Sequence, residues 1–295
     1  MAPSGLLALP FLLAAALLRS STASPCRTSC GGVQVDYPFG IADGCGAPQL
    51  RGWLSCNDTS GMFLQTPSGA YKVESVDYQK QRMMVYDPSM STCSVLQPPH
   101  DLILSDVQYA IMLPSEDTVY ALLNCSMDSP VVNRYRYLCL ADAGGHTCDE
   151  LYGSCSAFRI FHMSSNTTAP ACCFTRYTTL RFMNMNMLDC THYATFVGSD
   201  QGRGLRGIEP LDWNYGIGLS FTVPPESGCR RCKRSGGTCG FDTDSGANMC
   251  LCPGNVNTTG ECAGGGLADG GDRAAPGRRI LLMALCLLLS FYQTI

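Results

Sequence analysis

Short alternating and apolar runs dominate the hydrophobic pattern of the chain. Hydrophobic residues alternate with polar ones from Val33 to Tyr37 and from Tyr71 to Val76, which is the period of two that a half-buried strand shows. No stretch combines a 3.6-residue period with capping residues, so we predict a mostly β fold of short strands and irregular loops. Further short runs bounded by turn residues lie at Arg82–Tyr86, Leu102–Leu104, Thr118–Leu123 and Gly216–Val223.

The first residues, 1–23, are typical of a signal peptide. Leu6 to Leu18 is an apolar run of the length that such a peptide uses, and Ser21-Thr22-Ala23 supplies small residues for cleavage. Cleavage there would start the mature chain at Ser24 and direct the protein into the secretory pathway.

A second apolar stretch, residues 280–295, follows a Gly- and Ala-rich linker at 263–279. It is shorter than the about 20 apolar residues of a spanning helix. An arginine pair precedes it and no basic residue follows it, so a membrane span with the preceding domain outside the cell would break the positive-inside rule. Small residues, a spacer and an apolar terminus are typical of a GPI-attachment signal, with Ala268, Asp269 or Gly270 as the attachment residue. A short membrane anchor is the alternative interpretation.

Cysteine usage agrees with secretion. One of the 19 cysteines, Cys286, lies in the apolar tail, and the remainder is even. In an oxidising compartment this number predicts a disulfide-rich ectodomain with cystine-held loops, although the sequence does not give the pairing. The candidates are Cys26, Cys30, Cys45, Cys56, Cys93, Cys125, Cys139, Cys148, Cys155, Cys172, Cys173, Cys190, Cys229, Cys232, Cys239, Cys250, Cys252 and Cys262. N-glycosylation sequons begin at Asn57, Asn124, Asn166 and Asn257.

Four cysteines between Cys26 and Cys56 surround a turn, Tyr37-Pro38-Phe39-Gly40. Pro38 ends a strand because it has no N–H to donate, and Gly40 permits the tight turn. The stretch resembles the opening of the galacturonan-binding domain of plant wall-associated receptor kinases. We therefore assign residues 24–130 to a galacturonan-binding-like domain. A structural turn without a ligand role is the alternative interpretation.

A dense cysteine cluster after Gly216–Val223 contains Ser235-Gly236-Gly237-Thr238-Cys239-Gly240. This motif is similar to the C-terminal wall-associated module of the same family. The adjacent Cys172-Cys173 and the segment Cys190–Val197 resemble the middle of such an ectodomain. We assign residues 131–262 to a C-terminal wall-associated cysteine-rich module.

Zinc is the competing interpretation of Cys229, Cys232, Cys250 and Cys252. Paired cysteines at short spacing can form a tetrahedral thiolate site. However, a single residue separates the second pair and the compartment oxidises thiols, so we predict disulfides and no metal.

The resemblance implies de-esterified pectin, a polymer with one carboxylate per sugar, as the ligand. Guanidinium groups hold carboxylates with paired donors, and aromatic rings stack on sugar faces. The formal net charge of −4 means that a polyanion needs a local basic patch or Ca²⁺ that bridges carboxylates. Two groups are candidate ligand residues: Arg230, Arg231, Lys233 and Arg234, and the predicted strand of Arg134, Tyr135, Arg136 and Tyr137. Their plainer interpretations are a solvated charge run and an edge strand with one solvated face.

The residues do not favour catalysis. The histidines lie in no recognisable nucleophile or metal motif, and the sequence lacks the phosphate loop, His-Arg-Asp and Asp-Phe-Gly of a kinase. We expect a non-catalytic protein of the outer plasma membrane face or cell wall that binds pectic polysaccharide and no nucleic acid, and that signals through a membrane-spanning receptor kinase. The alternatives are a GPI-anchored co-receptor for a peptide or receptor-kinase ectodomain, and a secreted enzyme or enzyme inhibitor acting on wall polymers.

Overall fold

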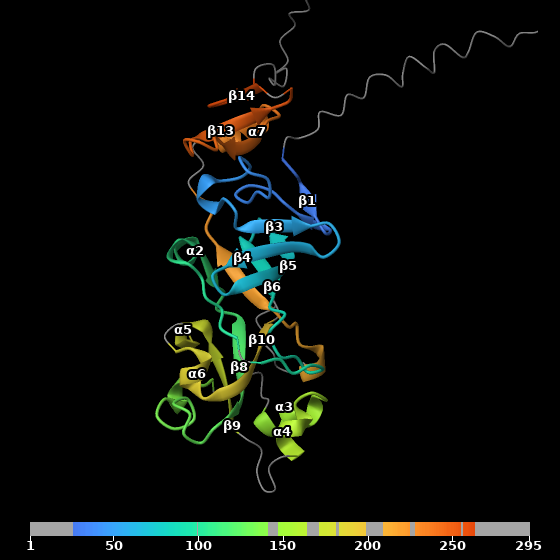
Figure 1. Ribbon diagram of the computed structural model, residues 1–295, viewed down its shortest axis with the longest axis vertical. Helices are drawn as coiled ribbons and strands as arrows, with labels where there is room; N and C mark the ends of the chain where they lie inside the picture. Colours follow the sequence, from blue (N-terminus) through green and yellow to red (C-terminus); the bar gives the residue numbers. More distant parts are fainter. Residues whose placement is uncertain are drawn as a thin grey trace, which may run out of the picture.

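The three larger of four β-sheets in the described residues follow one another along the long axis of the molecule in a computed structural model (Figure 1). The last strands of the chain form the sheet at one end, a six-stranded sheet lies in the middle, and a second three-stranded sheet lies at the other end. Strands are short and exceed helices, which confirms the predicted fold class. The structure describes residues 26–98, 100–140, 147–163, 171–180, 183–198, 209–224, 228–254 and 256–262.

The six-stranded sheet is antiparallel throughout. It confirms the predicted strands at Tyr71–Val76 and Arg82–Tyr86, whose alternate side chains enter one core. The strand β11 (Ile217–Phe221) comes from far along the chain and places Leu219 opposite Met83. The order is β3 (Leu54–Asn57), β4 (Gly61–Thr66), β5 (Gly69–Asp77), β6 (Arg82–Tyr86), β11 and β7 (Met112–Pro114).

The predicted strand at Val33–Tyr37 is shorter than expected. Only β2 (Val33–Gln34) is a strand, and it pairs with β1 (Ser29–Cys30). The Asp36 N–H donates to the Tyr78 hydroxyl at 2.8 Å instead of to a neighbouring strand, and the Tyr37–Pro38 peptide bond is cis. The backbone therefore leaves the ladder before the turn is reached.

The second sheet has the order β10 (Cys190–Val197), β8 (Thr118–Cys125) and β9 (Ala171–Arg176). Ala121 and Leu123 of β8 face one buried cluster, and Leu122 faces another. Both faces of this strand are buried, which explains why its sequence is an apolar run with little alternation. Helices α3 (Cys148–Ser154) and α4 (Arg159–Met163) contribute to the first cluster, and α5 (Tyr177–Leu180) and α6 (Met185–Leu188) contribute to the second.

Two short capped helices were not predicted from the sequence. Helix α2 (Asp106–Ile111) has a capping box in which the Ser105 hydroxyl accepts from the Gln108 N–H, and Thr147 and Glu150 form the same arrangement at α3. These helices have 6 and 7 residues, which is too short to display a 3.6-residue period. The spacing of the capping residues was the available signal. Single 3₁₀ turns occur at η2 (Pro48–Leu50), η3 (Arg136–Leu138) and η4 (Pro210–Asp212).

The C-terminal sheet surrounds a core of cystines. It contains β12 (Thr238–Phe241), β13 (Asn248–Cys252) and β14 (Val256–Thr258), with the helix α7 (Cys229–Arg234) packed beside it. Six half-cystines form its buried cluster, so disulfides take the place of a large hydrophobic core.

All of the predicted disulfide candidates are paired, in nine bridges. The pairing joins neighbours within each sheet region and never links the C-terminal cystines to the others. The bridges are Cys26–Cys45, Cys30–Cys56, Cys93–Cys155, Cys125–Cys190, Cys139–Cys173, Cys148–Cys172, Cys229–Cys239, Cys232–Cys250 and Cys252–Cys262.

The domain boundary near residue 130 stays a prediction. Strand pairing crosses long stretches of sequence, since β11 completes a sheet that the first strands begin. Strand pairing alone does not say which parts of a chain fold independently.

Candidate functional site

The four candidate basic residues all lie in the helix α7. Arg230 and Arg231 lie between its two buried cysteines, and Lys233 and Arg234 follow the second cysteine. All four side chains are exposed. Three of them lie in the last turn, where positive charge interacts favourably with the helix dipole. The cluster is therefore a surface feature that also suits its position in the helix.

Lys233 connects this helix to the first part of the chain. Its Nζ lies 2.9 Å from Asp36 Oδ1 and 6.0 Å from the centre of the Tyr37 ring. Both charged side chains are 43% exposed, so the ion pair contributes at most about 1 kcal/mol to stability. Its main effect is to hold the basic helix against the Tyr37–Pro38 turn.

Backbone contacts fix the same junction more firmly. The Gly46 N–H donates to the Cys239 carbonyl at 3.1 Å, and the Phe241 N–H donates to the Gly44 carbonyl at 2.8 Å. Arg51 adds a guanidinium group that pairs with Asp43 and lies over the ring of Phe241. Strand β12 is thus docked on the turn that the first disulfide, Cys26–Cys45, closes.

Replacing Gly240 with alanine is expected to open this junction. A Cβ at Gly240 would lie 2.2 Å from the Gly44 carbonyl oxygen, a backbone atom that the surrounding turn holds in place. The Gly46 and Phe241 amides should lose most of their protection in hydrogen exchange. Gly260→Ala is the matched control, since a Cβ there meets nothing within 4 Å. Unchanged protection in Gly240→Ala would show that the two segments are held together without this contact.

The second candidate group does not form the predicted strand. Residues 131–134 are turns, and Arg136–Leu138 is the 3₁₀ turn η3. The Tyr135 N–H donates to the Pro130 carbonyl at 2.6 Å, so local bonds replace those of a ladder. Five alternating residues were too few to distinguish a strand from a turn, and the exposed side chains do not alternate, since 133, 134, 136 and 137 are all exposed.

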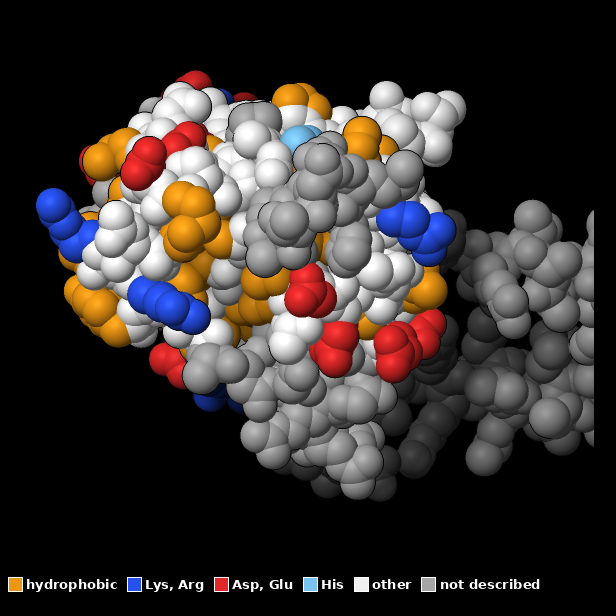
Figure 2. Space-filling view, turned by 90° about the horizontal axis from the view of Figure 1, so that it is seen from below, with side chains coloured by type: hydrophobic (Ala, Val, Ile, Leu, Met, Phe, Trp, Pro, Cys, Tyr) orange, Lys and Arg blue, Asp and Glu red, His pale blue; other side chains and the backbone are white. Residues whose placement is uncertain are grey.

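Arg134, Arg136 and Tyr137 are exposed, and Tyr135 packs edge-to-face on Tyr137 with ring centres 6.2 Å apart. The segment is tied to β9 through the Cys139–Cys173 bridge, so it belongs to the end of the molecule opposite α7. Figure 2 views that end, where basic side chains lie apart from one another and several acidic ones lie close together. The structure therefore does not bring the two candidate groups together.

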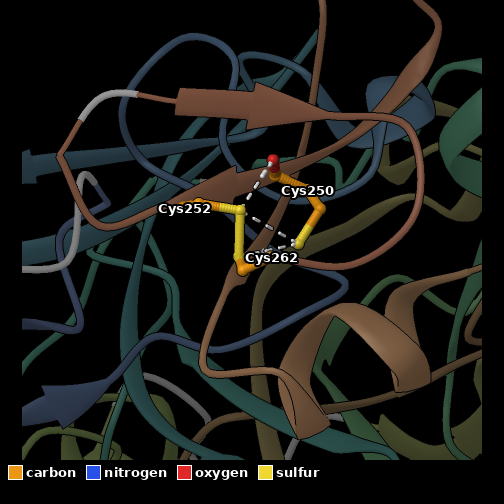
Figure 3. A group of neighbouring side chains, drawn as sticks. All are labelled: Cys250, Cys252 and Cys262. Carbon is orange, nitrogen blue, oxygen red and sulfur yellow. Dashed lines mark hydrogen bonds between the residues drawn. A yellow bond between two sulfur atoms is a disulfide. The ribbon is translucent and has the colours of Figure 1, made fainter. Parts of the chain in front are cut away.

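The zinc interpretation is wrong for the cysteines on which it rested. Cys229, Cys232, Cys250 and Cys252 each belong to a disulfide. Figure 3 shows the crowding that suggests a metal: the Cys250 sulfur lies 3.6 Å from Cys262, which is bonded to Cys252. A disulfide sulfur is not the thiolate that zinc requires.

The sequons whose residues are described differ in their surroundings. Asn57 and Asn257 are exposed, as a glycosylated residue must be. Asn124 is half-buried, and its side-chain amide donates to the Thr191 hydroxyl at 2.8 Å. Asn166, the signal peptide and the attachment candidates Ala268, Asp269 and Gly270 lie outside the described residues. Within the described ranges, no helix is long and apolar enough to cross a membrane.

One cleft was not predicted from the sequence at all. It has a volume of about 550 Å³ and is lined by residues of 100–104, α2, β8 and β10, and by residues around α5 and α6. The run Leu102–Leu104, which was expected to be a strand, forms part of its irregular rim. The Ser68 hydroxyl forms hydrogen bonds with the backbone of Ile103 and so holds this rim in place. The rim ends at Ser105, which caps the helix α2. Because the lining comes from several distant segments, no local pattern marks the cleft.

Two family models match the chain. Residues 26–87 match the model described as wall-associated receptor kinase galacturonan-binding, and residues 212–255 match wall-associated receptor kinase C-terminal. The resemblance inferred from the sequence is thereby confirmed for both segments, and neither match is to a kinase domain. No curated protein and no solved structure matches the chain.

These matches are to modules of receptor ectodomains, which are not catalytic and belong to the cell wall side of the membrane. The first match contains β1 to β6, and the second contains β11, α7, β12 and β13. Since β11 pairs with β6, the two matched segments share one sheet as well as the junction at Lys233.

Proposed function

We propose that this chain, which carries the galacturonan-binding and C-terminal modules of wall-associated receptor kinase ectodomains, is a non-catalytic cell-surface protein that binds pectic polysaccharide. One observation supports this most directly: the basic helix α7 lies against the galacturonan-binding segment at Asp36 and Tyr37. Exposed guanidinium groups beside that segment provide what an acidic polymer needs from a protein whose net charge is negative.

The cations of α7 have different roles in this proposal. Lys233 positions the helix, because Asp36 already neutralises its charge. Arg230, Arg231 and Arg234 present exposed guanidinium groups to the carboxylates of the polymer. Tyr37 is half-buried at the edge of the same surface and offers part of its ring to a sugar face.

Neutralising the three arginines together is expected to weaken binding of de-esterified oligogalacturonides by about tenfold or more, since hydrogen bonds to charged groups contribute about 1.5–3 kcal/mol each when well formed. The variant is Arg230→Gln, Arg231→Gln and Arg234→Gln in the ectodomain Ser24 to Asp269. Calorimetric titration at several salt concentrations measures the affinity of each protein for oligogalacturonides. The affinity of the unchanged protein should fall as salt screens the charges.

The control is Arg134→Gln with Arg136→Gln, which also removes positive charges, but from the other end of the molecule. Equal losses in the two variants would mean that net charge, and not the α7 surface, governs binding. Titration with Ca²⁺ or with a chelator separates direct capture from bridging: loss on chelation alone would move the site to acidic residues and Ca²⁺. Absence of binding under every condition would favour the co-receptor for a peptide or receptor-kinase ectodomain.

The lipid anchor and the membrane-spanning receptor kinase partner belong to the same proposal. They rest on the sequence of the C-terminal residues and on the family of the two modules. Release of the protein from intact cells by a phospholipase that cuts GPI anchors tests the anchor; a protein that stays with the membrane would contradict it.

A further inference from the structure

The cleft between the segment 100–109 and the second sheet with its helices α5 and α6 has the size and lining of a ligand site. Its volume of about 550 Å³ lies within the range of about 300–1,000 Å³ that small-molecule pockets occupy. The loop 100–104 and α2 form one wall, and residues in or beside α5 and α6 form the other. Asp101 spans the two walls by accepting a hydrogen bond from the Met185 N–H at 2.9 Å, which holds the cleft in its shape.

Tyr120 gives the second, independent observation. This residue of β8 lines the cleft with only 3% of its surface exposed, and its hydroxyl has no hydrogen-bond partner. Within the described ranges, only one other buried side-chain atom, an oxygen of Asp117, lacks a partner. A buried hydroxyl without a partner is costly, so its presence needs an explanation. Burial raises the pKa of Tyr120 well above its usual range, so the group stays an O–H donor.

The lining distinguishes this cleft from the α7 surface. Among the lining residues that the structure describes, the charged groups are the carboxylates of Asp101 and Asp106, and none is a lysine or an arginine. The rings of Tyr120 and Tyr177 lie 6.1 Å apart, and Tyr109 adds a third ring. Carboxylates accept hydrogen bonds from the hydroxyl groups of a sugar, and tyrosine rings pack on the apolar face of a sugar ring. Neither kind of group repels an uncharged ligand. A galacturonate carboxylate would instead meet like charge here.

We propose that this cleft binds a neutral saccharide and that the Tyr120 hydroxyl donates a hydrogen bond to one of its oxygens. The site differs in ligand charge and in residues from the pectin-binding surface at α7. It lies in a part of the chain, between residues 87 and 212, that neither family model covers.

The test uses the ectodomain Ser24 to Asp269 and tetrasaccharides of three charge states. Cellotetraose, mannotetraose and xylotetraose are the neutral probes, tetragalacturonate is the anionic probe and a chitosan tetramer is the cationic probe. We expect at least one neutral probe to bind, and Tyr120→Phe to weaken it by about tenfold, the effect of losing one hydrogen bond of about 1.4 kcal/mol. Tyr137→Phe is the control, because Tyr137 is exposed and outside the cleft.

Stability separates a ligand role from a structural one. Tyr120→Phe removes a hydroxyl that has no partner, so the thermal midpoint should be unchanged or higher. A lower midpoint with unchanged binding would overturn the proposal, as would binding of none of the neutral probes. Binding confined to the anionic or cationic probe would also overturn it, whatever the α7 variants show with oligogalacturonides.

Discussion

Replacing Gly237 with alanine is expected to prevent the C-terminal cystine cluster from forming. A Cβ at Gly237 would lie 2.4 Å from the sulfur of Cys250, 2.7 Å from that of Cys262 and 2.8 Å from that of Cys232. These sulfurs belong to two disulfides in a buried cluster, so none of them can move aside without breaking its packing. The cost should be about 3 kcal/mol or more, the upper part of the range for overpacked cores.

The measurement is the yield of secreted protein together with a disulfide map by mass spectrometry. We expect strongly reduced secretion and scrambled or free thiols among Cys232, Cys250 and Cys262. Gly260→Ala, in the same module and in open space, should be secreted with the native bridges. Secretion of Gly237→Ala at the normal level with its native pairing would show that the cluster can expand to accept a methyl group.

The same geometry explains why the Ser-Gly-Gly-x-Cys-Gly sequence takes this form. Gly236 has φ +81°, a conformation that L side chains rarely adopt. Gly237 leaves room for sulfur atoms, and Gly240 leaves room for the Gly44 carbonyl of the galacturonan-binding segment. The glycines of this motif are therefore required by cystine packing and by the junction, and none of them needs to touch a ligand.

Period-two patterns predicted the strands that have one buried face. β5 and β6 were found in this way because they lie in a sheet that buries alternate side chains. β8 was found as a short apolar run because both of its faces are covered. The pattern failed at Leu102–Leu104 and at Arg134–Tyr137, where side chains meet a cleft or solvent in the absence of a neighbouring strand.

Long-range contacts account for what the sequence did not predict. The cysteines were identified as bridged, but their partners depend on how the strands pair, and the spacing of cysteines along the chain does not give this. The contact between Lys233 and Asp36 joins residues 197 positions apart. The cleft at Tyr120 likewise needs residues from the loop 100–104, two strands and three helices in place. The basic cluster of α7 is therefore visible in the sequence, whereas the residues that it faces are not.

Deleting the Cys93–Cys155 bridge is expected to destabilise the second sheet by about 4 kcal/mol. The bridge closes a loop of 62 residues, and the entropy that a crosslink removes from the unfolded chain grows with loop length. Both cysteines are buried in the cluster that contains Trp213, so alanine replacements in Cys93→Ala with Cys155→Ala also leave a small cavity there.

Urea unfolding followed by tryptophan fluorescence in a Trp53→Phe background measures this effect, because Trp53 lies in the core of the six-stranded sheet and Trp213 in the affected cluster. Cys229→Ala with Cys239→Ala is the comparison: its loop spans 10 residues, for which the same relation gives about 3 kcal/mol, and its sulfurs lie in the C-terminal module. The Cys93 and Cys155 variant should therefore shift the Trp213 transition to lower urea, while the comparison variant leaves it nearly unchanged. Equal shifts in both variants would mean that the three sheets unfold as one unit, so that a bridge at either end stabilises the whole molecule.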